Sequence, residues 1–268
     1  MPYFTRRQCF PLVGALLGVS TELSAADLKP ETISAFDRHL AETEARFTPS
    51  VQGSKPLWFD APNIAQQLRA GASSVRPIQA NGLIPVKGGL IQHWAGAVFV
   101  PKATLKTALI VAQDYPSHTD IYKPEIGAAK IRAHQNDQFN VYLRYVKAKL
   151  FLSAVFNTEH KVDYIPVDAS RVWCRDVTTR IAEVNDAGKP NEKELPVGQD
   201  RGLLWRLASY RLFHERDGGV MISTETISLS RDIPFGMGKI MAPFVENLPG
   251  ESLQMSLDKT RKATLARL

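Results

Sequence analysis

The residues best suited to acid–base or binding chemistry lie on predicted strands in the second half of the chain. If Asp217-Gly218 forms a two-residue hairpin turn, Tyr210 lies directly opposite Glu225. Glu225 shares its face of the strand with apolar residues, where a carboxylate is costly to bury unless it accepts a hydrogen bond. Tyr210 is the expected donor, and Arg206 lies on the same face. The pattern predicts either a polar site on a pocket wall or a satisfied structural pair at the end of a sheet.

A second hairpin sends three aromatic side chains with polar atoms to one face. A turn at Ala148-Lys149 pairs Tyr145 with Leu152, and the same alternation places His160 and Tyr164 on the same inward side. There His160 could orient a ligand or act as a base, although a lone histidine on an apolar face is also typical of a hydrogen-bonded core residue. We predict Tyr145, His160 and Tyr164 as ligand-binding residues, together with the pair above and Arg206.

The strand predicted over residues 171–184 carries both signs of charge. Its apolar alternation puts Arg175 on the inward face and Asp176 on the opposite face. An inward arginine could bind an acidic headgroup, whereas a bulge in the strand would turn it out to solvent.

The sequence contains no complete catalytic or metal-binding motif. It has no Gly-x-Ser-x-Gly turn and no His-x-x-x-His spacing, and Cys174 has no neighbouring histidine. We therefore predict no catalytic residue, no metal and no cofactor. A cyclase or dehydratase needs only one base and one acid in an apolar pocket, and His160, Tyr164 and Glu225 could supply them. Such an enzyme is the main alternative to a binding protein.

These residues must be positioned by elements that follow a distinctive order. One strand-like segment (90–100) precedes two helical segments (103–114 and 115–123), and a series of strands follows. Those strands are predicted at 128–133, 139–147, 150–166, 171–184, 204–216 and 220–230. Consecutive antiparallel strands twist and curl. A long helix laid across the concave face would leave a cavity where the apolar faces do not fully meet.

The C-terminal region supplies that helix. Its apolar residues recur at helical spacing from 233 to 248 and continue over 253–265. Met237 and Met241 lie in the first stretch, and we predict that both contact the ligand. The predicted fold is α+β, with a curved antiparallel sheet of about seven strands wrapped around a long C-terminal helix.

The first 87 residues are expected to form a signal peptide and a helical extension. Arg6-Arg7 precede a short apolar stretch (9–19), and Ser24-Ala25-Ala26 offers a cleavage site that ends a signal peptide over 1–26. Residues 5–10 resemble a twin-arginine export signal, so the protein is expected in the periplasm or secreted. The alternative is a natively buried N-terminal helix. Amphipathic helices at 27–48 and 62–70 form an extension (27–87) before the ligand-binding domain (88–268).

Composition limits the classes of partner. The 268-residue chain is 44% hydrophobic and 22% charged, as is typical of a globular protein, and no apolar run reaches the roughly 18 residues of a membrane-spanning helix. The net charge is +6, but the basic residues are scattered and no nucleic-acid-binding motif is present. We expect no nucleic-acid partner. The basic surface is compatible with transient contact with an anionic membrane, and the pattern leaves the oligomeric state open.

Two motifs carry a resemblance to a known superfamily. Residues 111–116 (VAQDYP) lead into 121–126 (IYKPEI), and Gly218-Gly219-Val220 precede ISLSR at 227–231. With the element order from Gly88 to Leu265, they resemble the START/Bet v 1-like (SRPBCC, helix-grip) superfamily, which includes polyketide cyclases and coenzyme-Q-binding proteins. The resemblance implies a cavity for a lipid, isoprenoid, polyketide or other apolar molecule. It carries over no catalytic residue.

The predicted function is therefore binding or transport of a hydrophobic small molecule or lipid outside the cytoplasm. The enzyme described above would use the same cavity. A second alternative is an envelope interaction protein that uses the helices of residues 27–70 as a partner surface. The interaction protein, unlike the other two, predicts that protein side chains fill the space under the C-terminal helix.

Overall fold

The computed structural model describes residues 25–79, 81–149, 152–233 and 246–268. Met237 and Met241 lie outside these residues, as does nearly all of the predicted signal peptide. The N-terminal elements are β1 (Ala26–Asp27), α1 (Pro30–Val51), the 3-10 helix η1 (Trp58–Asp60), α2 (Pro62–Arg69), β2 (Ser73–Pro77) and β3 (Leu83–Val86). The remaining elements are β4 (Gly89–Pro101), α3 (Leu105–Gln113), η2 (Tyr115–Ser117), α4 (His118–Ile121), β5 (Ile126–Gln135), β6 (Gln138–Lys149), β7 (Leu152–Asp168), β8 (Arg171–Asn185), β9 (Lys193–Glu194), β10 (Gln199–Asp200), β11 (Arg206–Arg216), β12 (Gly219–Ser230) and α6 (Leu248–Leu265).

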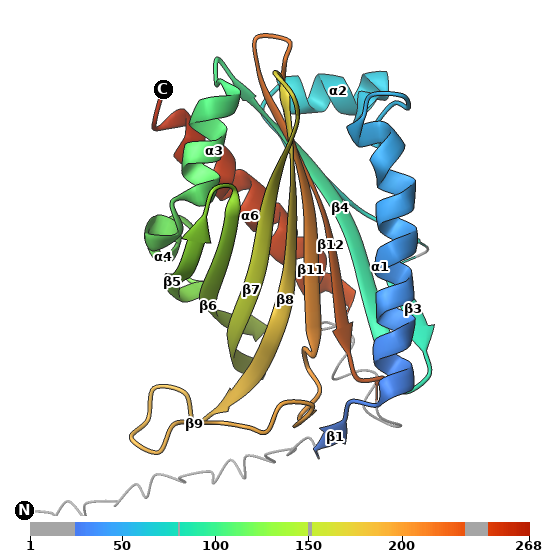
Figure 1. The fold of residues 1–268 in the computed structure, drawn as a ribbon, viewed down its shortest axis with the longest axis vertical. Helices are drawn as coiled ribbons and strands as arrows, with labels where there is room; N and C mark the ends of the chain where they lie inside the picture. The colour runs from blue at the N-terminus through green and yellow to red at the C-terminus, as the bar shows by residue number, and fades with distance from the viewer. Residues whose placement is uncertain (1–24, 80, 150–151, 234–245) are drawn as a thin grey trace, which may run out of the picture.

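One antiparallel sheet of ten strands forms the body of the described chain. Its order is β2-β4-β12-β11-β8-β7-β6-β5, with β3 paired to β4 and β9 paired to β8. The sheet curves without closing (Figure 1). The seven long strands that the sequence predicts are all present. The sheet is larger than expected because β2 and β3, which come from the predicted extension, and the two-residue β9 also join it.

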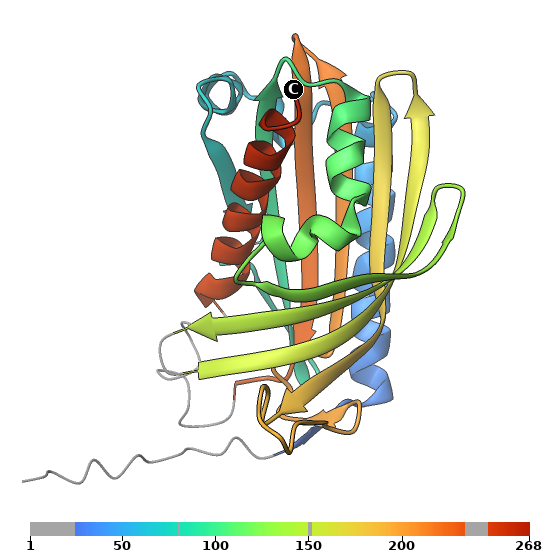
Figure 2. The same ribbon diagram turned by 90° about the vertical axis from the view of Figure 1, so that its left-hand side faces the viewer.

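The helices α6 and α1 cover opposite faces of this sheet (Figures 1 and 2). α6 packs on β4 and β2, and its Leu253 and Leu257 share a buried cluster with Val98 and Ile222 of the strands. Gly96 of β4 permits this approach, because a Cβ at that position would lie 2.6 Å from Leu257. The curved sheet that grips a C-terminal helix confirms the predicted α+β fold.

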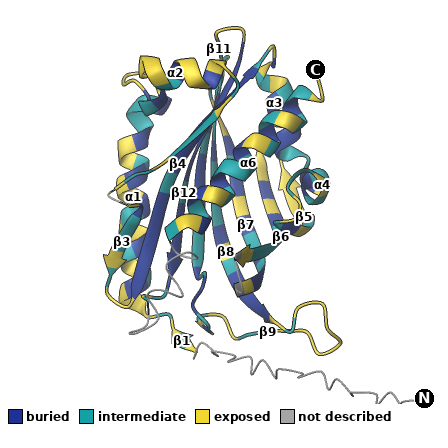
Figure 3. Ribbon diagram, turned by 180° about the vertical axis from the view of Figure 1, so that it is seen from behind, coloured by how far each residue is buried: buried dark blue, intermediate teal, exposed yellow. Residues whose placement is uncertain are grey.

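α1 packs along the other face of the sheet. Pro30 stands in its first turn, where the missing N–H breaks no helical hydrogen bond. Phe36, Leu40 and Phe47 repeat on its buried side at helical spacing, and the first two pack against Ile227 of β12. Figure 3 shows exposed residues along the side of α1 away from the sheet. Within the described ranges, no helix has the length and apolar character needed to cross a membrane.

The hairpin between β11 and β12 has the predicted register. Its turn residues Asp217 and Gly218 have φ angles of 55° and 73°, and a type I′ turn needs positive φ at both positions. Tyr210 therefore pairs with Glu225. The register alone does not decide which helix these two side chains face.

The hairpin between β6 and β7 has a different register from the one predicted. Tyr145 pairs with Phe156, four residues beyond the predicted partner Leu152, so the predicted pairing is wrong. Because side chains alternate with a period of two, a shift of four residues leaves each side chain on its predicted face. Tyr145 and His160 consequently still lie on the α6 side of the sheet.

Candidate functional site

A cavity of about 200 Å³ lies between the sheet and α6. Its wall comes from the inward faces of the central strands, from the segment between α3 and β5, and from one side of α6. Apolar side chains such as Leu143, Phe156, Leu207 and Leu257 form much of this wall. A cavity of roughly 150 Å³ accommodates benzene, so the space has room for an apolar group about the size of one ring.

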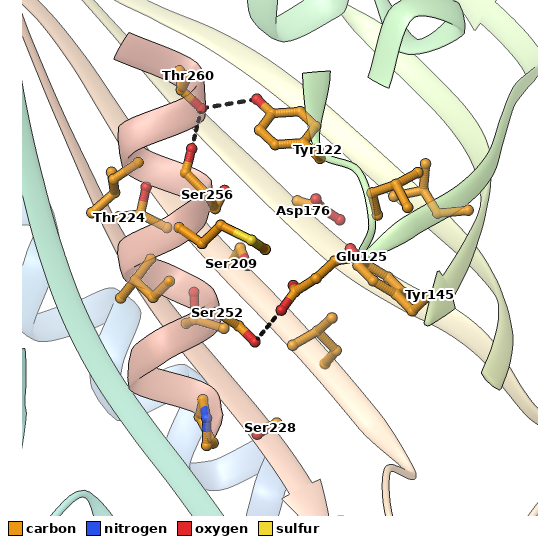
Figure 4. A pocket seen from close by; sticks show the side chains of 18 of the residues that line it. Tyr122, Glu125, Tyr145, Asp176, Ser209, Thr224, Ser228, Ser252, Ser256 and Thr260 are labelled. Atoms are coloured by element: carbon orange, nitrogen blue, oxygen red, sulfur yellow. Dashed lines mark hydrogen bonds between the residues drawn. The ribbon is translucent and has the colours of Figure 1, made fainter. Parts of the chain in front are cut away.

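Hydroxyl groups reach this cavity from three strands (Figure 4). Tyr145 of β6, Ser209 of β11 and Thr224 of β12 all line it, and none of their hydroxyls makes a hydrogen bond to a described residue. Burial raises the pKa of Tyr145, so its phenol stays protonated. Because a polar group taken from water needs a partner, these hydroxyls are available to a bound molecule.

Asp176 of β8 is held by His160 behind the cavity wall, and Thr158 in turn contacts His160. His160 Nδ1 lies 2.7 Å from Asp176 Oδ1, and His160 Nε2 lies 2.7 Å from Thr158 Oγ1. The Thr158 hydroxyl also lies within hydrogen-bond distance of the Leu143 carbonyl (2.9 Å). These contacts fix the orientation of the Asp176 carboxylate in the cavity wall.

Arg211 of β11 brings a positive charge to the same wall. Its Nη2 lies 3.9 Å from Asp176 Oδ2, which is too long for a hydrogen bond. The guanidinium makes no hydrogen bond to any residue in the described ranges, and its side chain keeps 29% of its accessible surface. Burial raises the pKa of Asp176, but His160 and Arg211 lower that pKa by more. The arginine donors are therefore open to the cavity.

His118 of α4 adds a neutral ring to the cavity lining. Burial, and then the charge of Arg211, lower its pKa from 6.5 to about 4. The residue is 7% exposed, and its Nε2 has no hydrogen-bond partner within the described part of the chain. The rings of Tyr115 and Tyr122 lie 4.8 Å and 5.0 Å from the imidazole. At neutral pH this ring adds no charge to the cavity.

Two polar links tie α6 to the opposite rim of the cavity (Figure 4). Near the start of α6, Ser252 donates to Glu125 (2.8 Å), and Glu125 also pairs with Lys147. Near its end, the hydroxyls of Tyr122 and Thr260 lie 2.9 Å apart. These groups satisfy one another, in contrast to the hydroxyls on the strands.

Three of the predicted site residues lie on the cavity side of the sheet. Tyr145 lines the cavity, and His160 lies behind Asp176. Tyr164 is 3% exposed and belongs to the core: its hydroxyl lies 3.2 Å from that of Tyr115 and 3.1 Å from the Ala112 carbonyl, to which it donates. The part that each residue takes in binding stays a prediction.

The facing predicted for Tyr210 and Glu225 is wrong. The two residues pair as expected, but their side of β11 and β12 lies under α1. There Arg46 donates to Glu225 (2.6 Å), His93 Nε2 lies 3.1 Å from the same carboxylate, and Tyr210 donates to Glu44 (2.8 Å). The physical reason is that α1 covers the more apolar side of these strands. The more apolar face of β11 and β12 therefore packs under α1, and their opposite face lines the cavity.

The residues proposed for the acid–base chemistry of the alternative enzyme do not lie together in the structure. Glu225 lies on the opposite side of the sheet from His160 and Tyr164. Arg206 lies beside a separate hollow near the N-terminal end of α1, and it donates to the Trp205 carbonyl (3.0 Å). The described residues also contain no group of three or more His, Cys, Asp or Glu side chains that could hold a metal ion.

Sequence reasoning missed the charged groups of the cavity. The predicted facing of Arg175 and Asp176 is reversed: Arg175 donates to Glu44 of α1 (2.7 Å), and Asp176 lines the cavity. Arg211 alternates with Tyr210, so it faces the cavity once Tyr210 is assigned to α1. One signal was available in the small polar residues that alternate along β12. They are Thr224, Thr226 and Ser228, and all three line the cavity.

No protein-family model matches the sequence, and no curated protein matches it. The structure itself has the helix-grip fold that the resemblance to the START/Bet v 1-like superfamily predicts. Similar solved structures include the STAR-related lipid transfer protein from Xanthomonas axonopodis, with 14% identity and a TM-score of 0.44 over 71% of this chain and 99% of that chain. The Zhui aromatase/cyclase from Streptomyces sp. R1128 has 11% identity and a TM-score of 0.46 over 66% of this chain and 95% of that chain. A START superfamily protein from Mycobacterium smegmatis has 17% identity and a TM-score of 0.41 over 65% and 95% of the respective chains. All three are distant likenesses of fold.

Proposed function

We propose that this protein binds a hydrophobic small molecule or lipid in the cavity between the sheet and α6. The observation that carries the proposal is the cavity itself, about 200 Å³ of space where the sheet and α6 do not fully meet. Transfer of apolar surface from water into such a space is favourable, and an apolar pocket with a few convergent polar groups is the usual form of a ligand site.

The helices of the N-terminal extension do not favour the alternative of an envelope interaction protein. That alternative needs an apolar helix face that is free for a partner. The apolar side of α1 is already used against the sheet, where Phe36 is 1% exposed and Phe47 is 4% exposed. In α2, Leu68 is likewise fully buried.

Filling the cavity tests the proposal. Ser256 lies on the side of α6 that lines the cavity, so Ser256→Phe would place a ring in the space proposed for the ligand. We expect the wild-type protein to bind a neutral apolar probe, 3-phenyl-1-propanol, in isothermal titration calorimetry. Ser256→Phe should weaken that binding by roughly tenfold or more, because a contact loss of about 1.4 kcal/mol corresponds to a factor of ten.

Ser34→Phe is the matched control, since Ser34 is exposed on α1. This variant should bind the probe as the wild-type protein does. Equal binding by all three proteins would contradict the assigned site. A lack of any binding by the wild-type protein, with no copurified apolar molecule in native mass spectrometry, would contradict the proposed function.

The proposed location is outside the cytoplasm. Support comes from Arg6-Arg7, the apolar stretch after them and the small residues Ser24 and Ala26. In this proposal residues 1–26 are removed, which leaves the extension (27–87) and the ligand-binding domain (88–268). Protein made with its full N-terminus in an exporting bacterial host should then lack the first 26 residues by intact-mass measurement. A full-length mass confined to the cytoplasmic fraction would contradict export.

A further inference from the structure

Four charged side chains of the described residues line the cavity: Glu125, Lys147, Asp176 and Arg211. Glu125 and Lys147 form an ion pair with each other. Asp176 Oδ1 lies 2.7 Å from His160 Nδ1, and Asp176 Oδ2 lies 3.9 Å from Arg211 Nη2, beyond hydrogen-bond distance. Within the described chain, Arg211 is therefore the charged group of this lining that has no hydrogen-bonded counter-ion.

The guanidinium of Arg211 also lacks acceptors for its hydrogens. It carries five N–H donors and no acceptor of its own, and a charge that leaves water is costly unless it is paired and hydrogen-bonded. The Asp176 oxygen closest to it lies 3.9 Å away, and the other oxygen is already bonded to His160. The free hydroxyls of Tyr145 and Thr224 line the same space.

We propose that the ligand is an amphipathic monoanion whose carboxylate binds Arg211 and whose apolar part fills the cavity. This inference rests on the proposed function and narrows it to one chemical class of ligand. A carboxylate supplies two acceptor oxygens in a plane, which matches the planar fork of a guanidinium.

The dimensions of the cavity set the size of the apolar part. About 200 Å³ exceeds only slightly the roughly 150 Å³ that holds benzene. A carboxylate with one ring or a short aliphatic chain therefore fits, and 3-phenylpropanoate is a suitable probe. The neutral alcohol 3-phenyl-1-propanol has the same apolar part and lacks the charge, so the two compounds isolate the contribution of the carboxylate.

The test compares both probes in isothermal titration calorimetry at pH 7.5. We expect the wild-type protein to bind 3-phenylpropanoate at least roughly tenfold more tightly than the alcohol, since hydrogen bonds to charged groups are the strong ones. Arg211→Met keeps the apolar stem and removes the donors. It should weaken carboxylate binding by roughly 10- to 100-fold and change alcohol binding by less than about threefold.

Two further variants separate a binding role from a structural one. Arg211→Lys keeps the charge without the fork and should bind the carboxylate with intermediate affinity. Arg38→Met is the matched control on the exposed side of α1 and should leave both affinities unchanged. Circular dichroism and thermal melts identify any variant that is unfolded. The comparison of the two probes on the wild-type protein tests the inference without any variant.

The outcomes distinguish this inference from the function on which it rests. Equal binding of the two probes by the wild-type protein would overturn the anionic ligand and leave a cavity that binds neutral molecules. Equal loss of both probes in a folded Arg211→Met protein would show that Arg211 only shapes the cavity, which also overturns it. Binding of neither probe to the wild-type protein would overturn the proposed function as well.

Discussion

The two faces of the β11–β12 hairpin differ in how their polar groups are satisfied. On the face under α1, Glu225 bonds with Arg46 and His93, and Tyr210 donates to Glu44. On the face under α6, one residue away along each strand, Thr224 and Ser209 line the cavity and have no hydrogen-bond partner in the described chain. The charged groups of the α1 face are therefore paired, although the buried Ser223 hydroxyl on that face has no partner in the described chain. The hydroxyls of Thr224 and Ser209 on the α6 face are free for a ligand.

The largest expected effect is on the α1 face. Glu225→Ala leaves the buried His93 without its acceptor and Arg46 without its counter-ion. We expect a loss of roughly 3 kcal/mol in the free energy of unfolding, the lower end of the range for a broken buried pair, because Arg46 is half exposed and regains water. Urea unfolding measures this loss.

The same variant tests the separation of the two faces. Because Glu225 does not line the cavity, a folded Glu225→Ala protein should bind 3-phenyl-1-propanol with wild-type affinity. A large loss of stability together with wild-type binding supports the separate roles assigned to the α1 face and the α6 face. A loss of binding with unchanged stability would place Glu225 in the ligand site and contradict the comparison.

The second-largest expected effect is a pH dependence of the unfolding free energy, caused by His118 on the α6 side of the sheet. His118 has a pKa of about 4 in the folded protein, below its ordinary 6.5, so the unfolded chain takes up a proton first as the pH falls. The stability contributed by the neutral ring is complete above pH 6.5 and is lost as the pH falls towards 4. Titration of His118 should lower the free energy of unfolding by about 2–3 kcal/mol between pH 7.5 and pH 4.

His118→Phe keeps a ring at this position and removes the titration. Urea unfolding of both proteins at a series of pH values should show the wild-type protein losing stability relative to His118→Phe between pH 6.5 and pH 4. Parallel curves for the two proteins would show that His118 is not the titrating group, and the neutral ring assigned to the cavity would then be wrong.

The smallest effect compares two tyrosines, one from each face. Tyr210→Phe removes the hydrogen bond to Glu44 and should cost about 1 kcal/mol of unfolding free energy, with no change in ligand affinity. Tyr145→Phe removes a hydroxyl that has no partner among the described residues. Its stability should change by less than about 0.5 kcal/mol, and its affinity for 3-phenylpropanoate should fall a few-fold. The reverse result, in which Tyr210→Phe weakens binding and Tyr145→Phe lowers stability, would contradict the roles assigned to the two faces.

The errors of sequence reasoning at this site have one physical origin. The apolar side of β12, which carries Met221 and Ile227, looks like the inner side of a sheet that has one covered face. In the protein both faces of the central strands are covered, so the more apolar side can lie under either helix. α1 takes that side, and this single fact reverses the predicted facing of Glu225, Tyr210 and Asp176.

The β6–β7 hairpin shows a different limit. No Gly, Asn or Asp fixes its turn, so its register does not follow from local residues, and the predicted pairing is wrong by four positions. By contrast, Asp217-Gly218 suits the positive φ angles of a type I′ turn, and the predicted pairing of Tyr210 with Glu225 is confirmed.

The sequence by itself determined the order of strands and helices and the alternation of side chains along each strand, because these depend on residues a few positions apart. Only the tertiary structure decided which side of each strand meets α1 and which meets the cavity, and hence that Arg211 and Asp176 line it. That choice depends on the packing of α1 and α6, which lie some 200 residues apart in the chain, against the two sides of one sheet. No local pattern contains this information.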